Sequence, residues 1–192
     1  MDVHHWDDMY RSRDQVFSGN PNPVLVAEVG CLPPGQALDV GCGEGADALW
    51  LARCGWQVTA VDVSEVALRR AAGAAEADVR DRLAWARADL TVAPPPARAF
   101  DLVSVHYFPI RREPGHAALY GLLNAVAPGG AFLFVTHPLP DPASAPRSAE
   151  YYQPGDIAQL LGPAWHVLVE ETRPRAGPRH THDAVLRASR LR

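Results

Sequence analysis

Residues 37–54 place a short apolar run, a glycine-rich loop and a helical pattern in direct succession, and this order restricts the fold more than any other feature. Residues 37–40 are mostly apolar, which is typical of a short buried strand, and the loop Gly41-Cys42-Gly43-Glu44-Gly45 follows at once. Residues 46–54 repeat apolar side chains at helical spacing, and Gly55 is placed to end the helix. A strand that turns through glycines into a helix predicts the first half of a βαβ unit.

Strand-like runs and helical patterns alternate along most of the chain that follows. Ser64 is placed to cap the helix after the second strand, with Glu65 in its first turn. The alternation predicts an α/β fold with a doubly wound, mainly parallel sheet and helices on both faces. No helical pattern separates the last two runs, so we expect an antiparallel C-terminal strand pair at the sheet edge. The expected elements are strands at 58–61, 83–86, 100–105, 131–135, 165–171 and 183–189, and helices at 116–126 and ending near 161.

Composition and charge narrow the class of partner. The chain has 192 residues, of which 47% are hydrophobic and 21% charged, and this suits a globular protein with a substantial core. Its formal net charge of −4 gives no reason to expect binding to nucleic acid or to an acidic membrane surface. No apolar run approaches the roughly 20 residues that cross a bilayer, and the polar N-terminus is not typical of a signal peptide. We therefore expect a cytoplasmic protein with no metal and no membrane or nucleic-acid partner, and its oligomeric state stays open.

The glycine loop predicts a nucleotide-type cofactor, and two carboxylates near it indicate which kind. The loop follows a G-x-G-x-G spacing, whereas the dinucleotide fingerprint is G-x-G-x-x-G. Asp39 stands two residues before the first glycine, where its charge would repel a pyrophosphate but suits an ammonium and a sulfonium group. Asp62 ends the next strand, a position from which a carboxylate accepts hydrogen bonds from a ribose diol. These features favour S-adenosylmethionine over a nicotinamide dinucleotide.

Five short motifs occur in a fixed order between about residues 36 and 136. They are Asp39-Val40-Gly41-Cys42-Gly43-Glu44-Gly45, Val61-Asp62-Val63-Ser64, Ala88-Asp89-Leu90, Phe100-Asp101-Leu102-Val103 and Pro128-Gly129-Gly130. In this order and spacing they resemble the class I S-adenosylmethionine-dependent methyltransferases. Within that family, residues 6–10 and 19–23 resemble the small tellurite-resistance and thiopurine-type methyltransferases. The resemblance implies a Rossmann-like fold, S-adenosylmethionine as the cofactor and methyl transfer to an acceptor, for which we expect a small molecule.

The resemblance also implies a role for each motif residue. Gly41 and Gly43 would lie against the methionine part of the cofactor, and Asp39 would help to orient its ammonium group. Asp62 would hold the ribose hydroxyls. Cys42 is a small loop residue whose pKa the nearby helix N-terminus is expected to lower. The other implied cofactor contacts are Val63 on the adenine, Asp89 near the adenine amino group with Leu90 beside it, Tyr10 in the N-terminal segment, and His106 near the methyl group.

We expect one domain over residues 1–192. Near its start, Trp6, Tyr10 and Phe17 predict a helical stripe that packs on the domain, and the resemblance implies that this segment folds over cofactor and substrate. The three expected parts are an N-terminal lid or cap segment at 1–34, a cofactor-binding core at 35–136, and a substrate loop with the C-terminal antiparallel strands at 137–192.

The acceptor and its general base stay open. His106 is the first candidate for a base or an acceptor contact, because it follows a predicted parallel strand. His137 also follows one, but Pro138 favours a structural turn there, and a thiol acceptor needs no base. The long loop 138–148 is expected to border the acceptor pocket. Two other functions stay open: a non-catalytic module that binds S-adenosylmethionine or its product, and an NAD-type oxidoreductase, which the glycine spacing and the lack of lysine disfavour.

Overall fold

The chain divides into two compact units, unit 1 at residues 1–89 and unit 2 at residues 90–192. The computed structural model describes residues 3–140, 146–175 and 181–192. Each unit combines strands with helices, as the alternating sequence pattern predicts. Among the described residues, no helix is long and apolar enough to cross a bilayer. The single-domain division with boundaries at 34 and 136 stays a prediction.

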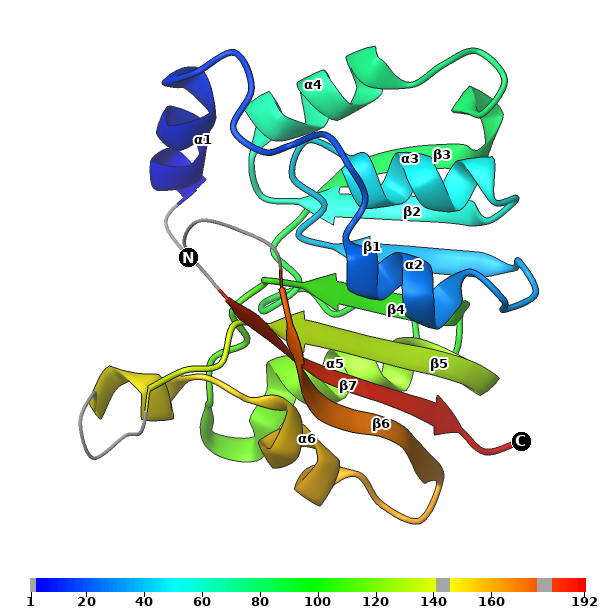
Figure 1. The fold of residues 1–192 in the computed structure, drawn as a ribbon, viewed down its shortest axis with the longest axis vertical. Coiled ribbons are helices and arrows are strands. Elements are labelled where there is room, and N and C mark those ends of the chain that lie inside the picture. The colour runs from blue at the N-terminus through cyan, green and yellow to red at the C-terminus, as the bar shows by residue number, and fades with distance from the viewer. Residues whose placement is uncertain (1–2, 141–145, 176–180) are drawn as a thin grey trace. The chain divides into compact units, whose positions relative to one another are not determined.

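Unit 1 is built on parallel strands in the order β3-β2-β1 (Figure 1). These strands are β1 (Gln36–Val40), β2 (Gln57–Asp62) and β3 (Leu83–Arg87), and each contains the run expected there. Helix α3 (Ala46–Arg53) connects β1 to β2, and α4 (Glu65–Ala74) with the short turn η1 (Arg80–Arg82) connects β2 to β3. Because the strands are parallel, the carboxyl ends of β1 and β2 share one edge, which brings the glycine loop next to Asp62.

Two helices precede the sheet of unit 1. Helix α1 (Val3–Arg11) packs against α4 and buries Tyr10, so the stripe expected in this segment is helical as far as Arg11. Phe17 lies beyond the end of α1, although its ring meets that of Tyr10 edge to face at 6.2 Å between centroids. Helix α2 (Pro23–Val29) was not expected from the proline-rich sequence. Pro23 occupies its first turn, where the missing N–H costs no hydrogen bond.

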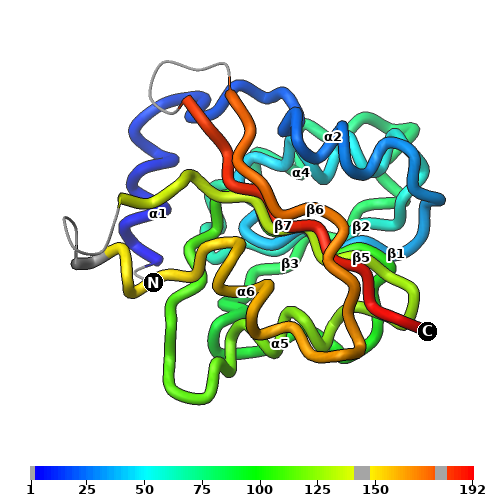
Figure 2. Tube along the Cα trace, turned by 60° about the horizontal axis from the view of Figure 1, so that its bottom comes forward, coloured from blue at the N-terminus to red at the C-terminus, as the bar shows by residue number. Residues whose placement is uncertain are grey.

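Unit 2 orders its strands β4-β5-β7-β6, and Figure 2 shows the last three running side by side. Strand β4 (Phe100–His106) pairs in parallel with β5 (Val126–Thr136), whereas β7 (His182–Arg190) pairs antiparallel with β5 and with β6 (Trp165–Pro174). The fully buried rings of Phe132 and Phe134 lie on β5 at the centre of this sheet. The remaining elements are α5 (Ala117–Ala125), α6 (Pro154–Leu160), η2 (Pro114–His116) and η3 (Pro146–Glu150).

The predicted fold class is confirmed: the strands are mainly parallel and the C-terminal pair is antiparallel. The expected turn at Pro128-Gly129-Gly130 is an irregularity inside β5. Phe100 pairs with Val126 and Leu102 with Ala131, so the residues between them bulge out of the ladder. Gly129 has a φ of +81° there, which glycine adopts without steric strain.

Candidate active site

The glycine loop after β1 is held tightly by unit 1 itself. Gly41, Gly43 and Gly45 have φ of +70°, +53° and +84°, a region that side chains disfavour. The N–H groups of Gly41 and Cys42 donate to the carbonyl of Val61, at 2.8 and 3.0 Å. The N–H of Gly45 donates to the carbonyl of Cys42 at 2.9 Å. These amides are therefore paired within the fold, and the glycines shape the loop more than they offer donors.

Asp39, near the end of β1, carries the strongest electrostatic signal of the loop. Its side chain is buried, with 2% of the residue exposed, and its Oδ2 has no hydrogen-bond partner among the described residues. Burial, with the nearby carboxylates of Asp47 and Asp62, raises the pKa of Asp39 well above its ordinary value. A buried carboxylate oxygen without a donor, next to two more acids, forms a site that favours a cation.

Asp62 ties the end of β2 to the loop. Its Oδ2 accepts from the N–H of Gly43 at 2.9 Å and its Oδ1 from the N–H of Ser64 at 2.8 Å. Burial outweighs these hydrogen bonds and raises its pKa above the ordinary aspartate value. The N–H of Val63 is a third backbone donor to this carboxylate, which has about four lone-pair sites and so keeps capacity for a further hydrogen bond. The side chain thus has the chemistry expected of a diol acceptor.

The expected lowering of the Cys42 pKa is wrong. Burial raises the pKa of the Cys42 thiol well above its ordinary value, and the negative charges of Asp39 and Asp62 raise it further. The effect of the helix N-terminus on a thiolate is outweighed because the carboxylates are close and the group is desolvated. Cys42 is therefore a structural loop residue and not a reactive thiol.

The N-terminal segment lies directly on the glycine loop. A Cβ on Gly43 would stand 2.8 Å from the Tyr10 hydroxyl, so only glycine leaves room for this contact. Burial, with Asp62 and Glu44 nearby, raises the pKa of Tyr10. Glu44 accepts from the N–H of Phe17 at 2.9 Å and from Arg70 of α4 at 2.9 Å. Tyr10 thus covers the loop from a segment that Glu44 holds in place.

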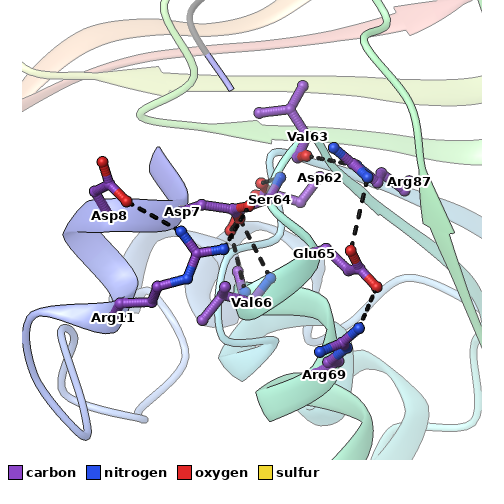
Figure 3. A network of polar contacts seen from close by, with 11 residues as sticks. Asp7, Asp8, Arg11, Asp62, Val63, Ser64, Glu65, Val66, Arg69 and Arg87 are labelled. Carbon is purple, nitrogen blue, oxygen red and sulfur yellow. Dashed lines mark hydrogen bonds and ion pairs between the residues drawn. The ribbon is translucent and has the colours of Figure 1, made fainter. Parts of the chain in front are cut away.

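A second anchor joins α1 to the start of α4, as Figure 3 shows. Ser64 accepts from the N–H of Ala67 at 3.2 Å, which confirms the expected cap, and its hydroxyl donates to the buried Asp7 at 2.6 Å. This hydrogen bond lowers the pKa of Asp7. Arg87 of β3 donates to the carbonyl of Val63 at 3.1 Å. This hydrogen bond stabilises the turn after β2, where Val63 is expected to pack on the adenine.

The other residues expected at the cofactor site come from both units. Asp89 is half-buried just beyond β3, and Leu90 is buried with 7% exposed. His106 ends β4 and is 8% exposed, and its Nδ1 lies 3.1 Å from the hydroxyl of Ser104. The loop 138–148 falls partly outside the described residues, at 141–145.

In unit 2, His137, which the sequence analysis considered alone, lies in a cluster that the sequence analysis did not predict. Tyr107, His137, Arg175 and Asp183 meet where β4 and β5 end, β6 has ended and β7 begins. His137 and Tyr107 stack with ring centroids 4.5 Å apart and an interplanar angle of 25°. The antiparallel register Thr136↔Ala184 puts His137 opposite Asp183, a relation that only a correct strand register reveals.

Comparison with known proteins finds similarity to methyltransferases. Residues 37–130 match the family model described as a methyltransferase domain. The chain is 40% identical over 104 residues to an uncharacterized methyltransferase of Mycobacterium tuberculosis, covering 54% of this chain and 51% of that protein. It is 31% identical over 164 residues to the 27-O-demethylrifamycin SV methyltransferase of Amycolatopsis mediterranei, covering 77% and 57%. The chain thus spans about half the length of the curated relatives it matches.

Solved structures agree on the fold. A structure from work on the conversion of a disulfide bond into a thioacetal group during echinomycin biosynthesis matches with a TM-score of 0.74 and 24% identity, over 98% of this chain and 91% of that one. TehB from Haemophilus influenzae matches with a TM-score of 0.69 and 17% identity, over 97% and 67%. The domain match, the order of the motifs and the Rossmann-like fold agree with one another: residues 37–130 are similar to a methyltransferase domain, and the chain has a fold that solved S-adenosylmethionine-dependent methyltransferases share.

Proposed function

We propose that the protein transfers a methyl group from S-adenosylmethionine to a small-molecule acceptor. The observation that carries this proposal is the buried carboxylate of Asp39, whose Oδ2 has no hydrogen-bond partner among the described residues. S-adenosylmethionine brings an ammonium and a sulfonium group, and an acidic corner beside the glycine loop suits both. The same corner repels a pyrophosphate, which argues against a nicotinamide dinucleotide.

In this proposal, different residues of unit 1 bind different parts of the cofactor. Asp39 faces the ammonium group, and Asp62 holds the ribose hydroxyls with the lone-pair capacity that its backbone hydrogen bonds from Gly43, Val63 and Ser64 leave available. Gly41, Cys42 and Gly43 form the surface under the methionine part, and Tyr10 covers it. Val63 and Asp89 take the adenine, with Leu90, the first residue of unit 2, next to Asp89 in the chain. When bound, the cofactor supplies an electrophilic methyl group.

The acceptor is proposed to be a small molecule. The Amycolatopsis relative is named as a methyltransferase of 27-O-demethylrifamycin SV, and the net charge of −4 does not favour nucleic acid. His106 is kept as a proposed acceptor contact. It is buried at the end of β4, and parallel strands of α/β folds present their ligands at this end.

The test separates an enzyme from a binding module. Calorimetry with S-adenosylmethionine, S-adenosylhomocysteine and NAD measures binding, and mass spectrometry then follows S-adenosylhomocysteine formation with hydroxyl, amine and thiol acceptors. We expect binding of the first two ligands and turnover of at least one acceptor. Binding without any turnover would assign a non-catalytic module, and NAD binding alone would overturn the proposal.

A further inference from the structure

An ion pair between Glu44 and Arg70 joins the N-terminal segment to the core of unit 1. We propose that this pair, which we call the clasp, sets the rates at which the cofactor binds and leaves, because it holds Tyr10 over Gly43. The inference rests on the proposed function. It assigns Glu44 and Arg70 as positioning residues for cofactor exchange and defines the moving part, which we call the lid, as residues 3–17.

Glu44 of the glycine loop offers an acceptor to the main chain of the lid. Its carboxylate accepts from the N–H of Val16 at 3.1 Å and from the N–H of Phe17 at 2.9 Å. The Glu44 side chain is 12% exposed, and Arg70 of α4 donates to it at 2.9 Å. Because Arg70 compensates its charge within the core, the carboxylate can stay in place whether or not the lid is docked.

Arg70 supplies the donors of the clasp. Its Nη1 donates to Glu44, and its Nη2 donates to the carbonyls of Tyr10 and Arg13, each at 2.7 Å. The Tyr10 carbonyl lies in the last turn of α1, where carbonyls lack partners within the helix and a cation is favourable. Glu44 and Arg70 together bind four main-chain groups of residues 10–17, so this docking does not depend on the side chains of the lid.

The lid buries little apolar surface. The buried residues of α1 are Asp7 and Tyr10, and Asp7 is held by the hydroxyl of Ser64 (Figure 3). Of residues 11–20, all but Val16 are exposed. A cavity of about 390 Å³ is lined by residues of this turn, of α3 and of α4, so the turn is not closely packed on the helices. Segments with few buried apolar contacts open locally at a low free energy, so the polar bonds decide whether the lid stays docked.

The lid has a fixed end and a hinge. Asp47 of α3 accepts from the main-chain N–H and from the side-chain amide of Asn22, both at 2.7 Å, and this holds the chain where α2 begins. Between this anchor and the clasp lie residues 18–20, which are all exposed, and Gly19 has a φ of +73°. Glycine changes its backbone angles at little steric cost, and we therefore place the hinge at Gly19.

Opening of the lid moves Tyr10 away from the glycine loop. Tyr10 is 3% exposed, and its hydroxyl would stand 2.8 Å from a Cβ on Gly43, a residue of the proposed surface under the methionine part of the cofactor. In our proposal the cofactor binds and leaves while Tyr10 is away from this surface. The clasp acts on the free and the loaded protein alike, so it slows binding and release together and changes the affinity little.

Surface plasmon resonance with S-adenosylhomocysteine measures both rates. Glu44→Gln removes the charge that the clasp needs, and we expect the association and dissociation rate constants each to rise about 10-fold, with a change of less than about threefold in the dissociation constant. Glu76→Gln, which alters an exposed pair with Arg53 at 3.3 Å in the same unit, is the matched control and should change neither rate. Unchanged rates in Glu44→Gln, or rates that do not rise together, would overturn the proposal.

Hydrogen exchange of the ligand-free protein tests the clasp without the cofactor. In Glu44→Gln, the amides of α1 and of residues 16–17 should exchange about 10-fold faster, because the lid opens as one piece, whereas α2 beyond the hinge should keep its wild-type rate. A rise confined to residues 16–17 would contradict the lid. Arg70→Lys cannot offer a guanidinium fork to the same acceptors and should act in the same direction, so it provides the test if Glu44→Gln does not fold.

The failure of this inference and that of the proposed function are distinguishable. If the wild-type protein binds no S-adenosylhomocysteine, the proposed function fails, and the exchange experiment still decides whether the clasp holds the lid. If the wild-type protein binds S-adenosylhomocysteine and Glu44→Gln leaves both rates unchanged, the role of the clasp is refuted and the proposed function stands.

Discussion

In unit 1, the buried side chain of Asp39 destabilises the ligand-free folded state when it is ionised, and the same negative charge makes the site suitable for a cation. Because burial raises its pKa, the folded protein holds the Asp39 proton more tightly than the unfolded chain. Its contribution is therefore most favourable below the ordinary aspartate pKa of about 3.9 and is lost as pH rises through the raised value.

We therefore expect Asp39→Asn to stabilise the ligand-free protein at neutral pH by about 1 kcal/mol or more, since asparagine still accepts from the N–H of Ala48. The gain should disappear below about pH 4. The same variant should bind S-adenosylmethionine 10-fold to 100-fold more weakly, because a charge-assisted contact is lost. Thermal melts and calorimetry measure both, with exposed Asp81→Asn as the control. Unchanged affinity would refute the assigned role of Asp39.

At the scale of elements, the join between α1 and α4 depends on one hydroxyl. Ser64 caps α4 and donates to Asp7 of α1, so its loss acts on both helices. We expect Ser64→Ala to destabilise unit 1 by about 1 kcal/mol through the cap and to raise hydrogen exchange in both α1 and α4. Ser64→Thr, which keeps a hydroxyl, is the matched control. Faster exchange confined to α4 would show that Asp7 does not anchor α1.

The elements also show how far the sequence predicts this molecule. Strands β1 and β2 and helices α3 and α4 follow from apolar spacing and from local signals such as the glycine loop and Ser64, which act within a few residues of the element they end or begin. Helix α2 was not predicted, because its seven residues are too few to show a clear helical repeat of apolar side chains. The pairs Asp7–Ser64 and His137–Asp183 join distant parts of the chain, and no local spacing encodes them.

At the scale of the whole molecule, the candidate residues fall into two groups, one in each unit. Unit 1 contains the glycine loop, Asp39, Asp62 and the segment with Tyr10, whereas unit 2 contains His106 and the cluster around Asp183. The recognised motifs are concentrated in the first group, which explains why the cofactor is predictable and the acceptor is not. Residues that bind a common cofactor recur in a family, but acceptor residues differ with each substrate.

The division of the candidate residues by unit predicts which segments cofactor binding protects from hydrogen exchange. At 100 times its dissociation constant, S-adenosylhomocysteine should stabilise the protein by about 2.7 kcal/mol and raise the melting temperature accordingly. Hydrogen exchange should slow in the loop 41–45, in the turn 62–64 and in α1, because these segments form or cover the proposed cofactor surface. The pocket-lining residues at the opposite ends of the unit 1 strands, Gln36, Gln57 and Leu83, serve as the internal control and should not change. Protection at those residues, with none at the loop, would place the ligand elsewhere and refute the assigned cofactor site.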